Sequence, residues 1–96
     1  MTRITLFSPK KIEAGIIVMT RRVMDEIVPE DAAYCISKHV RGDWGLVCEE
    51  DKLENEFALD KELRILSEFK DSKGKRFWII TEADRSATTV LLPEEY

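Results

Sequence analysis

The spacing of hydrophobic residues changes near residue 64. Before this point, apolar positions recur every three or four residues, which is typical of one face of a helix. After it, apolar and polar residues tend to alternate, and β-branched and aromatic types dominate, as in strands. The chain therefore predicts helices first and a β-sheet last, which is an α+β fold.

Two or three short helices are expected before the change in spacing. Thr20 is a suitable N-cap for a helix over residues 21–27. Pro29 ends that helix and favours the start of the next, over residues 31–40. One stripe of this second helix carries the apolar residues Ala33, Ile36 and Val40, with Ala32 beside it.

A third helix and an N-terminal extended segment complete the first part of the chain. Residues 49–60 contain strong helix formers, and their narrow apolar stripe predicts a surface helix laid on the core through Leu53, Phe57 and Ala58. Residues 15–19 suit either a short buried strand or an extended entry into the first helix. Residues 1–13, interrupted by Pro9, are expected to be irregular.

Three strands are expected after residue 64, over residues 64–70, 76–82 and 87–92. Residues 71–75 have the composition of a hairpin loop, and Pro93 ends the last strand. Both faces of the middle strand are apolar, which favours a central position in the sheet. We therefore expect helices packed on one face of a three-stranded antiparallel meander, with an additional short N-terminal strand as an alternative at one edge.

Length and composition indicate one small globular domain over residues 1–96. The chain is 44% hydrophobic and 35% charged, and a domain of this size has room for one core between two layers. No apolar run approaches the roughly 20 residues that a membrane span needs, and no secretion signal is recognisable, so we expect a cytoplasmic protein without a membrane partner. Cys35 and Cys48 lack paired spacing and are expected to be free thiols, with Cys35 buried.

The charge of the chain, −4 overall, is unevenly distributed. Residues 1–22 carry a net charge of +4, whereas residues 48–62 carry seven carboxylates against two lysines. The acidic balance argues against phosphate-driven binding of nucleic acid. The acidic segment is either a solvated helix face or a surface for a basic protein partner.

Residues 39–45 form the first segment with candidate chemistry. They bring an imidazole (His39), a carboxylate (Asp43) and an indole (Trp44) together around two glycines. One hypothesis is a binding loop, or an acid–base pair of His39 and Asp43. The alternative is that His39 caps the helix C-terminus as a cation and that Trp44 is a core anchor held by Asp43.

Residues 81–89 form the second segment, in the turn between the last two strands. Its candidate site residues are Glu82, Asp84, Arg85 and Ser86. Carboxylates beside an arginine suit a metal, a phosphate or general acid–base catalysis. The alternative is turn chemistry, in which Asp84 and Ser86 bond nearby amides and Arg85 forms an ion pair.

No motif for a cofactor or a metal is present in the sequence. It has no phosphate-binding glycine loop, no dinucleotide fingerprint, no nucleophile elbow and no zinc ligand set, so we expect neither a cofactor nor a metal site. With a single histidine, any divalent ion would need oxygen ligands such as Asp43, Glu82 and Asp84.

The same two segments carry a resemblance to a known family. Residues 39–45 (HVRGDWG) and 78–96 (WIITEADRSATTVLLPEEY) resemble small uncharacterised bacterial proteins of plasmids and phages, some of them labelled subunits of type I restriction methyltransferases. The chain is too short for a methyl-donor domain. The resemblance implies an accessory protein of a mobile element, whose site would include His39, Asp43, Trp44, Glu82, Asp84, Arg85 and Ser86.

Two classes of function follow from these observations. The leading expectation is a non-enzymatic module that binds another protein, since the chain is small and has no recognisable catalytic set. The alternative is a small metal-dependent hydrolase or nuclease that uses His39 with Asp43 and Asp84 with Arg85. The two-faced apolar sheet also leaves a homodimer open.

Overall fold

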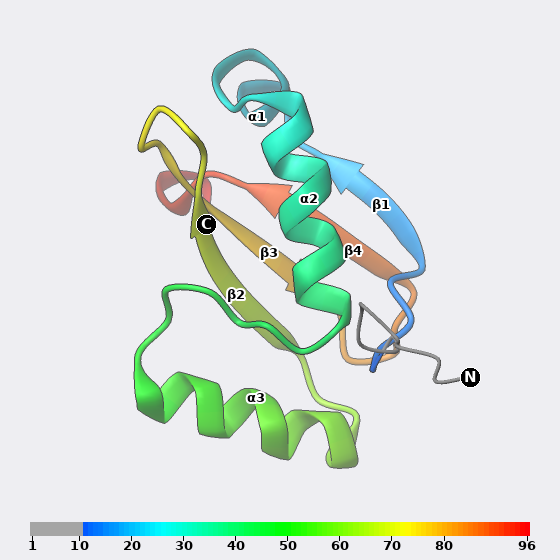
Figure 1. Ribbon diagram of the computed structural model, residues 1–96. Helices are drawn as coiled ribbons and strands as arrows, with labels where there is room; N and C mark the ends of the chain where they lie inside the picture. The colour runs from blue at the N-terminus through cyan, green and yellow to red at the C-terminus, as the bar shows by residue number, and fades with distance from the viewer. Residues whose placement is uncertain (1–10) are drawn as a thin grey trace, which may run out of the picture.

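The computed structural model describes residues 11–96, and Figure 1 shows their arrangement. Helices and strands follow in this order: β1 (Ile16–Met19), α1 (Arg21–Glu26), α2 (Pro29–Val40), α3 (Glu49–Lys61), β2 (Ile65–Lys70), β3 (Arg76–Thr81), β4 (Ala87–Leu91) and the 3-10 turn η1 (Pro93–Glu95). The predicted α+β class is confirmed. Residues 11–15 lie in neither helix nor strand, and the rest of the segment predicted to be irregular, residues 1–10, lies outside the described residues.

The sheet has four strands in the order β1-β4-β3-β2. The predicted meander of β2, β3 and β4 is antiparallel, and β3 is central. The sheet is completed by β1, the N-terminal edge strand given as an alternative, which is mostly exposed instead of buried and pairs in parallel with β4, Ile17 opposite Thr88. Local periodicity could not show this pairing, because it joins residues that are far apart in the sequence.

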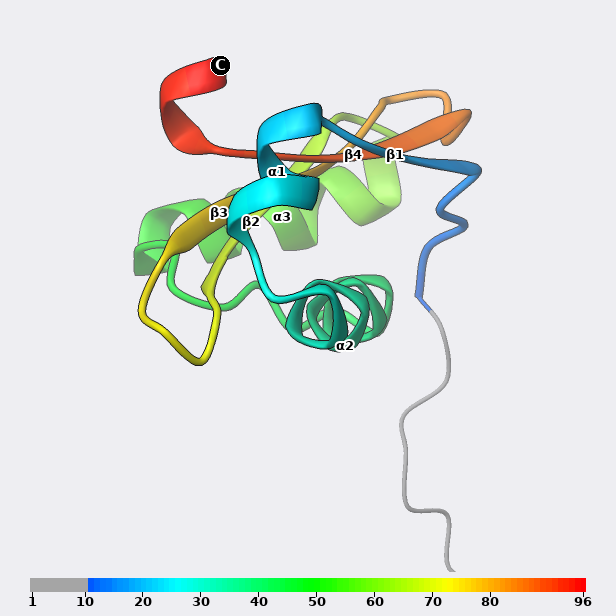
Figure 2. The same ribbon diagram turned by 90° about the horizontal axis from the view of Figure 1, so that it is seen from above.

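Helix α2 covers one face of the sheet, as Figure 2 shows from above, and α1 follows directly at the end of β1. The core between these layers is apolar and consists of Val23, Ile27, Ala32, Cys35, Phe69, Phe77, Ile79, Val90 and Leu92. The burial of Cys35 confirms the prediction for that thiol. The buried stripe of α2 is Ala32, Cys35 and His39, so the predicted stripe through Ala33 is rotated, and Ala33 is exposed.

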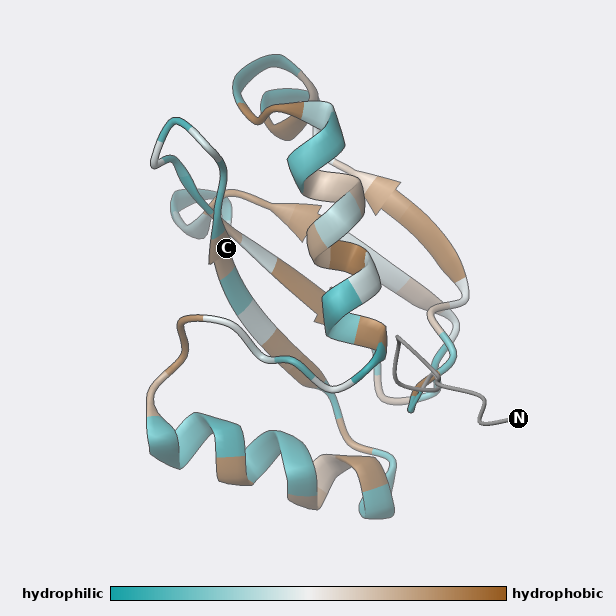
Figure 3. Ribbon diagram, viewed as in Figure 1, coloured by the Kyte–Doolittle hydropathy of each residue, from teal (hydrophilic) through white to brown (hydrophobic). Residues whose placement is uncertain are grey.

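Helix α3 lies along the outer edge of β2 instead of on a face of the sheet. The Asn55 side chain accepts from the Leu66 amide at 3.3 Å and donates to the Leu66 carbonyl at 2.7 Å, so it replaces a neighbouring strand. Ala58 is buried, whereas Leu53 and Phe57 are 70% and 58% exposed. The predicted docking stripe is therefore wrong for Leu53 and Phe57, and Figure 3 shows hydrophobic turns on this otherwise hydrophilic helix.

The loop before α3 covers the rest of the same sheet edge. Gly45 forms a parallel bridge with Glu68, the Leu46 amide donates to the Glu68 carbonyl at 2.6 Å, and the Glu68 amide donates to the Trp44 carbonyl at 3.3 Å. Backbone groups of β2 that would otherwise point to solvent are thus hydrogen-bonded. None of the helices within residues 11–96 is long and apolar enough to cross a membrane.

Candidate functional site

His39, the first candidate residue, lies inside the protein between α2 and the sheet. Its side chain is fully buried. Nδ1 lies 2.6 Å from Ser67 Oγ on β2, and Nε2 lies 2.8 Å from Thr81 Oγ1 on β3. His39 therefore ties the last turn of α2 to two adjacent strands, and it is not a cap of the helix C-terminus.

The hydrogen bonds around His39 determine its tautomer. Thr88 Oγ1 lies 2.7 Å from the Ala14 carbonyl oxygen, which can only accept, so the Thr88 hydroxyl donates there. The Thr81 hydroxyl, 2.7 Å from Thr88 Oγ1, then donates to Thr88. Thr81 must accept from Nε2–H of His39, and Nδ1 accepts from Ser67. The chain of bonds runs from the helix through the sheet to the residues before β1.

The surroundings of His39 also determine its charge. Burial, together with the positive charge of Arg85, lowers the pKa of His39 from 6.5 to about 4. The imidazole is therefore neutral at pH 7. Both ring nitrogens of His39 are hydrogen-bonded inside the protein. The imidazole therefore stabilises the core, and neither nitrogen is available to a substrate.

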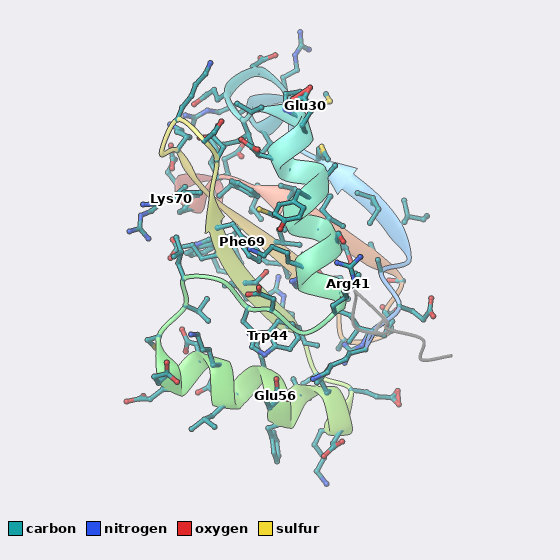
Figure 4. All side chains as sticks on the ribbon, in the orientation of Figure 1. Glu30, Arg41, Trp44, Glu56, Phe69 and Lys70 are labelled. Atoms are coloured by element: carbon teal, nitrogen blue, oxygen red, sulfur yellow. The ribbon has the colours of Figure 1, made fainter. Side chains whose placement is uncertain are left out.

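Asp43 and Trp44 have structural partners of their own. Asp43 Oδ1 accepts from the Gly45 amide at 3.0 Å, and Lys38 Nζ lies 3.8 Å from Asp43 Oδ2. Trp44 is buried, as its role as an anchor predicts, with its ring edge-on to His39 at 5.8 Å between centroids. Its indole N–H donates to Glu56 Oε2 at 2.8 Å, and Figure 4 shows the two side chains pointing toward each other. Glu56 therefore replaces Asp43 as the partner expected for the tryptophan.

The acidic residues of the second segment are also engaged. Asp84 Oδ1 accepts from the Ser86 amide at 3.0 Å, as the turn interpretation predicts. Hydrogen bonds from the side chain and the amide of Ser86 lower the pKa of Asp84. Glu82 Oε1 lies 3.7 Å from Arg64 Nε. The carboxylates of the turn are therefore bound to partners within the turn or next to it.

Arg85 binds carbonyl groups, and the ion pair expected for it is replaced by these contacts. Nη2 donates to the carbonyl of Ala58 in the last turns of α3 at 3.1 Å, and Nη1 donates to the carbonyl of Leu63 at 2.7 Å. Nη1 is also within hydrogen-bond distance of the carbonyls of Glu82 and Ala83. Arg85 therefore joins the β3–β4 turn to the end of α3.

Removing Arg85 should weaken this junction and change the titration of His39. We expect Arg85→Ala to lower the free energy of unfolding by about 1–2 kcal/mol, because carbonyls at the end of α3 lose their donor. The pKa of His39 should rise, since one cause of its depression is removed, and it should stay below 6.5 because burial remains. Histidine NMR titration measures this shift. An unchanged His39 pKa would contradict the assigned influence of Arg85.

The two segments meet through structural contacts rather than in an open cleft. His39 reaches Thr81, which lies at the start of the second segment, but Asp43 and Asp84 each bond the amide two residues ahead in their own turns. Within residues 11–96, no group of three or more His, Cys, Asp or Glu side chains is placed to hold a metal ion.

No known protein family matches the chain, and neither a curated protein nor a solved structure is similar to it.

A groove beside α3 is a site-like feature that the sequence did not indicate. It has a volume of about 380 Å³, and we call it the α3 groove; among its lining residues are Asp51, Glu54, Phe57, Leu63, Arg64 and Tyr96. Phe57 is the residue that could have indicated the groove. The hydrophobic pattern assigned its ring to the core, whereas the structure exposes it. Arg64 Nη1 donates to the Tyr96 hydroxyl at 2.6 Å, which joins two of the lining side chains.

Proposed function

We propose that the chain is a non-enzymatic protein-binding module whose α3 groove receives a basic segment of its partner. The observation that carries this proposal is a set of large apolar side chains in and beside the groove that remain in contact with water. Leu53, Phe57 and Tyr96 are 70%, 58% and 66% exposed, and Leu63 is about half exposed. Single exposed apolar residues are ordinary, but a group of this kind beside a groove is typical of an interaction surface.

The charge around the α3 groove defines the chemistry of the partner. Helix α3 carries six carboxylates and two lysines, and Asp51 and Glu54 line the groove itself. Lys61 Nζ lies 5.9 Å from the centre of the Phe57 ring. A segment with lysine or arginine beside an apolar anchor would match both features, because opposite charges steer the encounter and the anchor fills the groove.

The positions of the expected catalytic residues support binding over hydrolysis. His39 is enclosed and neutral, and Asp43, Asp84 and Arg85 serve turns and helix ends. The resemblance of residues 39–45 and 78–96 to proteins of plasmids and phages supports the role of an accessory protein of a mobile element. The partner would then be a protein of the host cell.

Selection of peptides from a random phage library on the immobilised chain tests the proposal. We expect the enriched peptides to be basic and to carry an apolar anchor. Changing Leu53 and Phe57 together to Ser should weaken their binding about tenfold or more, because contacts at the centre of a small interface carry most of the binding energy. The fold should be little affected, since both side chains are exposed. Higher salt should weaken binding further.

A matched control variant distinguishes binding at the α3 groove from binding at other exposed surfaces. Tyr34 on α2 is 62% exposed, similar to Phe57, and does not line the α3 groove. Tyr34→Ser should leave peptide binding unchanged. Enriched peptides without basic residues, or peptides that bind the Leu53/Phe57 variant as tightly as the parent chain, would refute the α3 groove as the binding surface.

A further inference from the structure

The α3 groove is apolar near the C-terminal end of α3 and acidic nearer its start. Phe57 and Leu63 line the apolar part, and Asp51 and Glu54 line the acidic part. Glu54 and Asp51 precede Phe57 by three and six residues, which places them about 5 and 9 Å from it along the helix axis. A segment bound in the groove therefore meets one apolar end and one acidic end.

The two carboxylates of the groove are not bound to other side chains. Within residues 11–96, neither Asp51 nor Glu54 forms an ion pair or a side-chain hydrogen bond. The neighbouring lysine, Lys52, has its Nζ 3.5 Å from Glu49 Oε1. Asp51 and Glu54 can therefore each bind a cation of the partner without losing an existing one.

The backbone groups beside the groove are already hydrogen-bonded. The Asn55 side chain bonds both the amide and the carbonyl of Leu66. Arg85 donates to the carbonyls of Ala58 and Leu63. At these three lining residues an extended segment would find no backbone partner, and its own amides and carbonyls would lose water without replacement. The groove therefore disfavours an added strand.

A helical segment does not need such partners. Its amides and carbonyls bond within the helix, so only its side chains have to match the groove. Asp51, Glu54 and Phe57 follow one another at intervals of three residues along α3. A second helix beside α3 repeats its side chains at a similar interval, so one apolar anchor and two cations can meet all three residues at once.

We infer that the segment received by the α3 groove is a basic amphipathic helix. This inference rests on the proposed function and adds the conformation of the partner. An apolar anchor packs against Phe57, Leu63 and Tyr96, of which the first and the last are 58% and 66% exposed. Lysines or arginines about four and seven positions from the anchor lie on the same face of the helix and bind Glu54 and Asp51.

Two synthetic peptides of equal composition test the helix. Both carry one leucine anchor and two lysines in an alanine background. The first has its lysines four and seven positions from the leucine, which is one face of a helix; the second has them two and six positions away, which is one face of a strand. In calorimetric titrations of the full chain, we expect the first peptide to bind about tenfold or more tightly than the second. Its helical circular dichroism should increase on binding.

A proline within the first peptide gives a second test. Placed between the leucine and the nearer lysine, proline removes a hydrogen bond of the helix and clashes with the preceding turn, so binding should fall about tenfold or more. An extended segment would tolerate the same change. Serine at that position is the control, and it should alter the affinity little.

A charge exchange tests the contact assigned to Glu54. Glu54→Lys should weaken binding of the first peptide about tenfold or more, and a peptide with glutamate in place of the nearer lysine should prefer this variant to the parent chain. Asp60→Lys is the matched control, because Asp60 is also exposed on α3 and does not line the groove. It should keep the affinity within about twofold of the parent chain, since solvent and salt screen its charge. Equal losses in the two variants would overturn the inference.

Failure of the helix and failure of the groove give different results. If the second peptide or the proline peptide binds as tightly as the first, and the Leu53/Phe57 double variant still loses it, the helix is wrong and the α3 groove remains the binding surface. If neither peptide binds the parent chain, and the phage library yields no basic peptide, the proposed function is wrong as well.

Discussion

Acidification from pH 7 to pH 4 should remove about 3 kcal/mol from the free energy of unfolding through His39 alone. The folded state holds the pKa of this imidazole at about 4, mainly by burial, whereas the unfolded chain binds the proton near 6.5. Between these two values the unfolded state takes up more protons, so stability falls as the pH falls. The contribution is fully present above about pH 6.5, and it is lost progressively toward pH 4.

Urea unfolding at half-unit steps between pH 7 and pH 4.5 measures this slope. Carboxyl groups contribute at lower pH; for example, the hydrogen bond from Arg22 lowers the pKa of Glu26 below its ordinary 4.5. His39→Gln keeps a donor and an acceptor but does not titrate, so it should be less stable at pH 7 and have a much flatter profile above pH 5. An equally steep profile in His39→Gln would show that another group is responsible.

Gly45→Ala should lower the free energy of unfolding by about 3 kcal/mol. Gly45 has a φ of +70°, which costs a residue with a side chain about 1–2 kcal/mol. An added Cβ would also collide with the Glu68 carbonyl oxygen and lie 2.8 Å from the Phe69 ring. The loop would have to leave β2, and the two backbone hydrogen bonds at Glu68 would be lost.

The melting temperature of this variant should fall by about 15 °C, since about 1 kcal/mol shifts a domain of this size by roughly 4–8 °C. Gly74→Ala is the control, because Gly74 also has a positive φ, +86°, and no atom lies within 4 Å of its added Cβ. Its loss should be limited to backbone strain, about 1 kcal/mol. Equal losses in the two variants would contradict the role assigned to the contact with Glu68.

The elements that alternation and turn residues define were predictable from the sequence. The predicted strands 64–70, 76–82 and 87–92 agree with β2, β3 and β4 to within one residue at each end, and the central position of β3 follows from its two apolar faces. Helix α3 was predictable as a helix but not as a neighbour of β2. Its docking depends on the side-chain amide of Asn55, and a hydrophobic pattern carries no information on such polar contacts.

The candidate residues were selected by type, and their roles depend on partners distant in sequence. His39 could be a base, a cap or a core residue until Ser67 and Thr81 are known to lie on either side of it. Arg85 similarly donates to one carbonyl of α3 and one just after it, more than twenty residues earlier in the chain. The turn bond of Asp84 was predictable, because its partner, Ser86, is two residues away.

The parallel pairing of β1 with β4 has a consequence for synthesis of the chain on the ribosome. Ile16 lies opposite Ala87, so the first strand is made roughly 70 residues before its only neighbour among the described strands. At about 5–20 residues per second, the nascent chain waits several seconds or longer with this apolar segment unpaired. During that interval the segment depends on the ribosome surface or on chaperones, and the sheet is completed only after β4 has emerged.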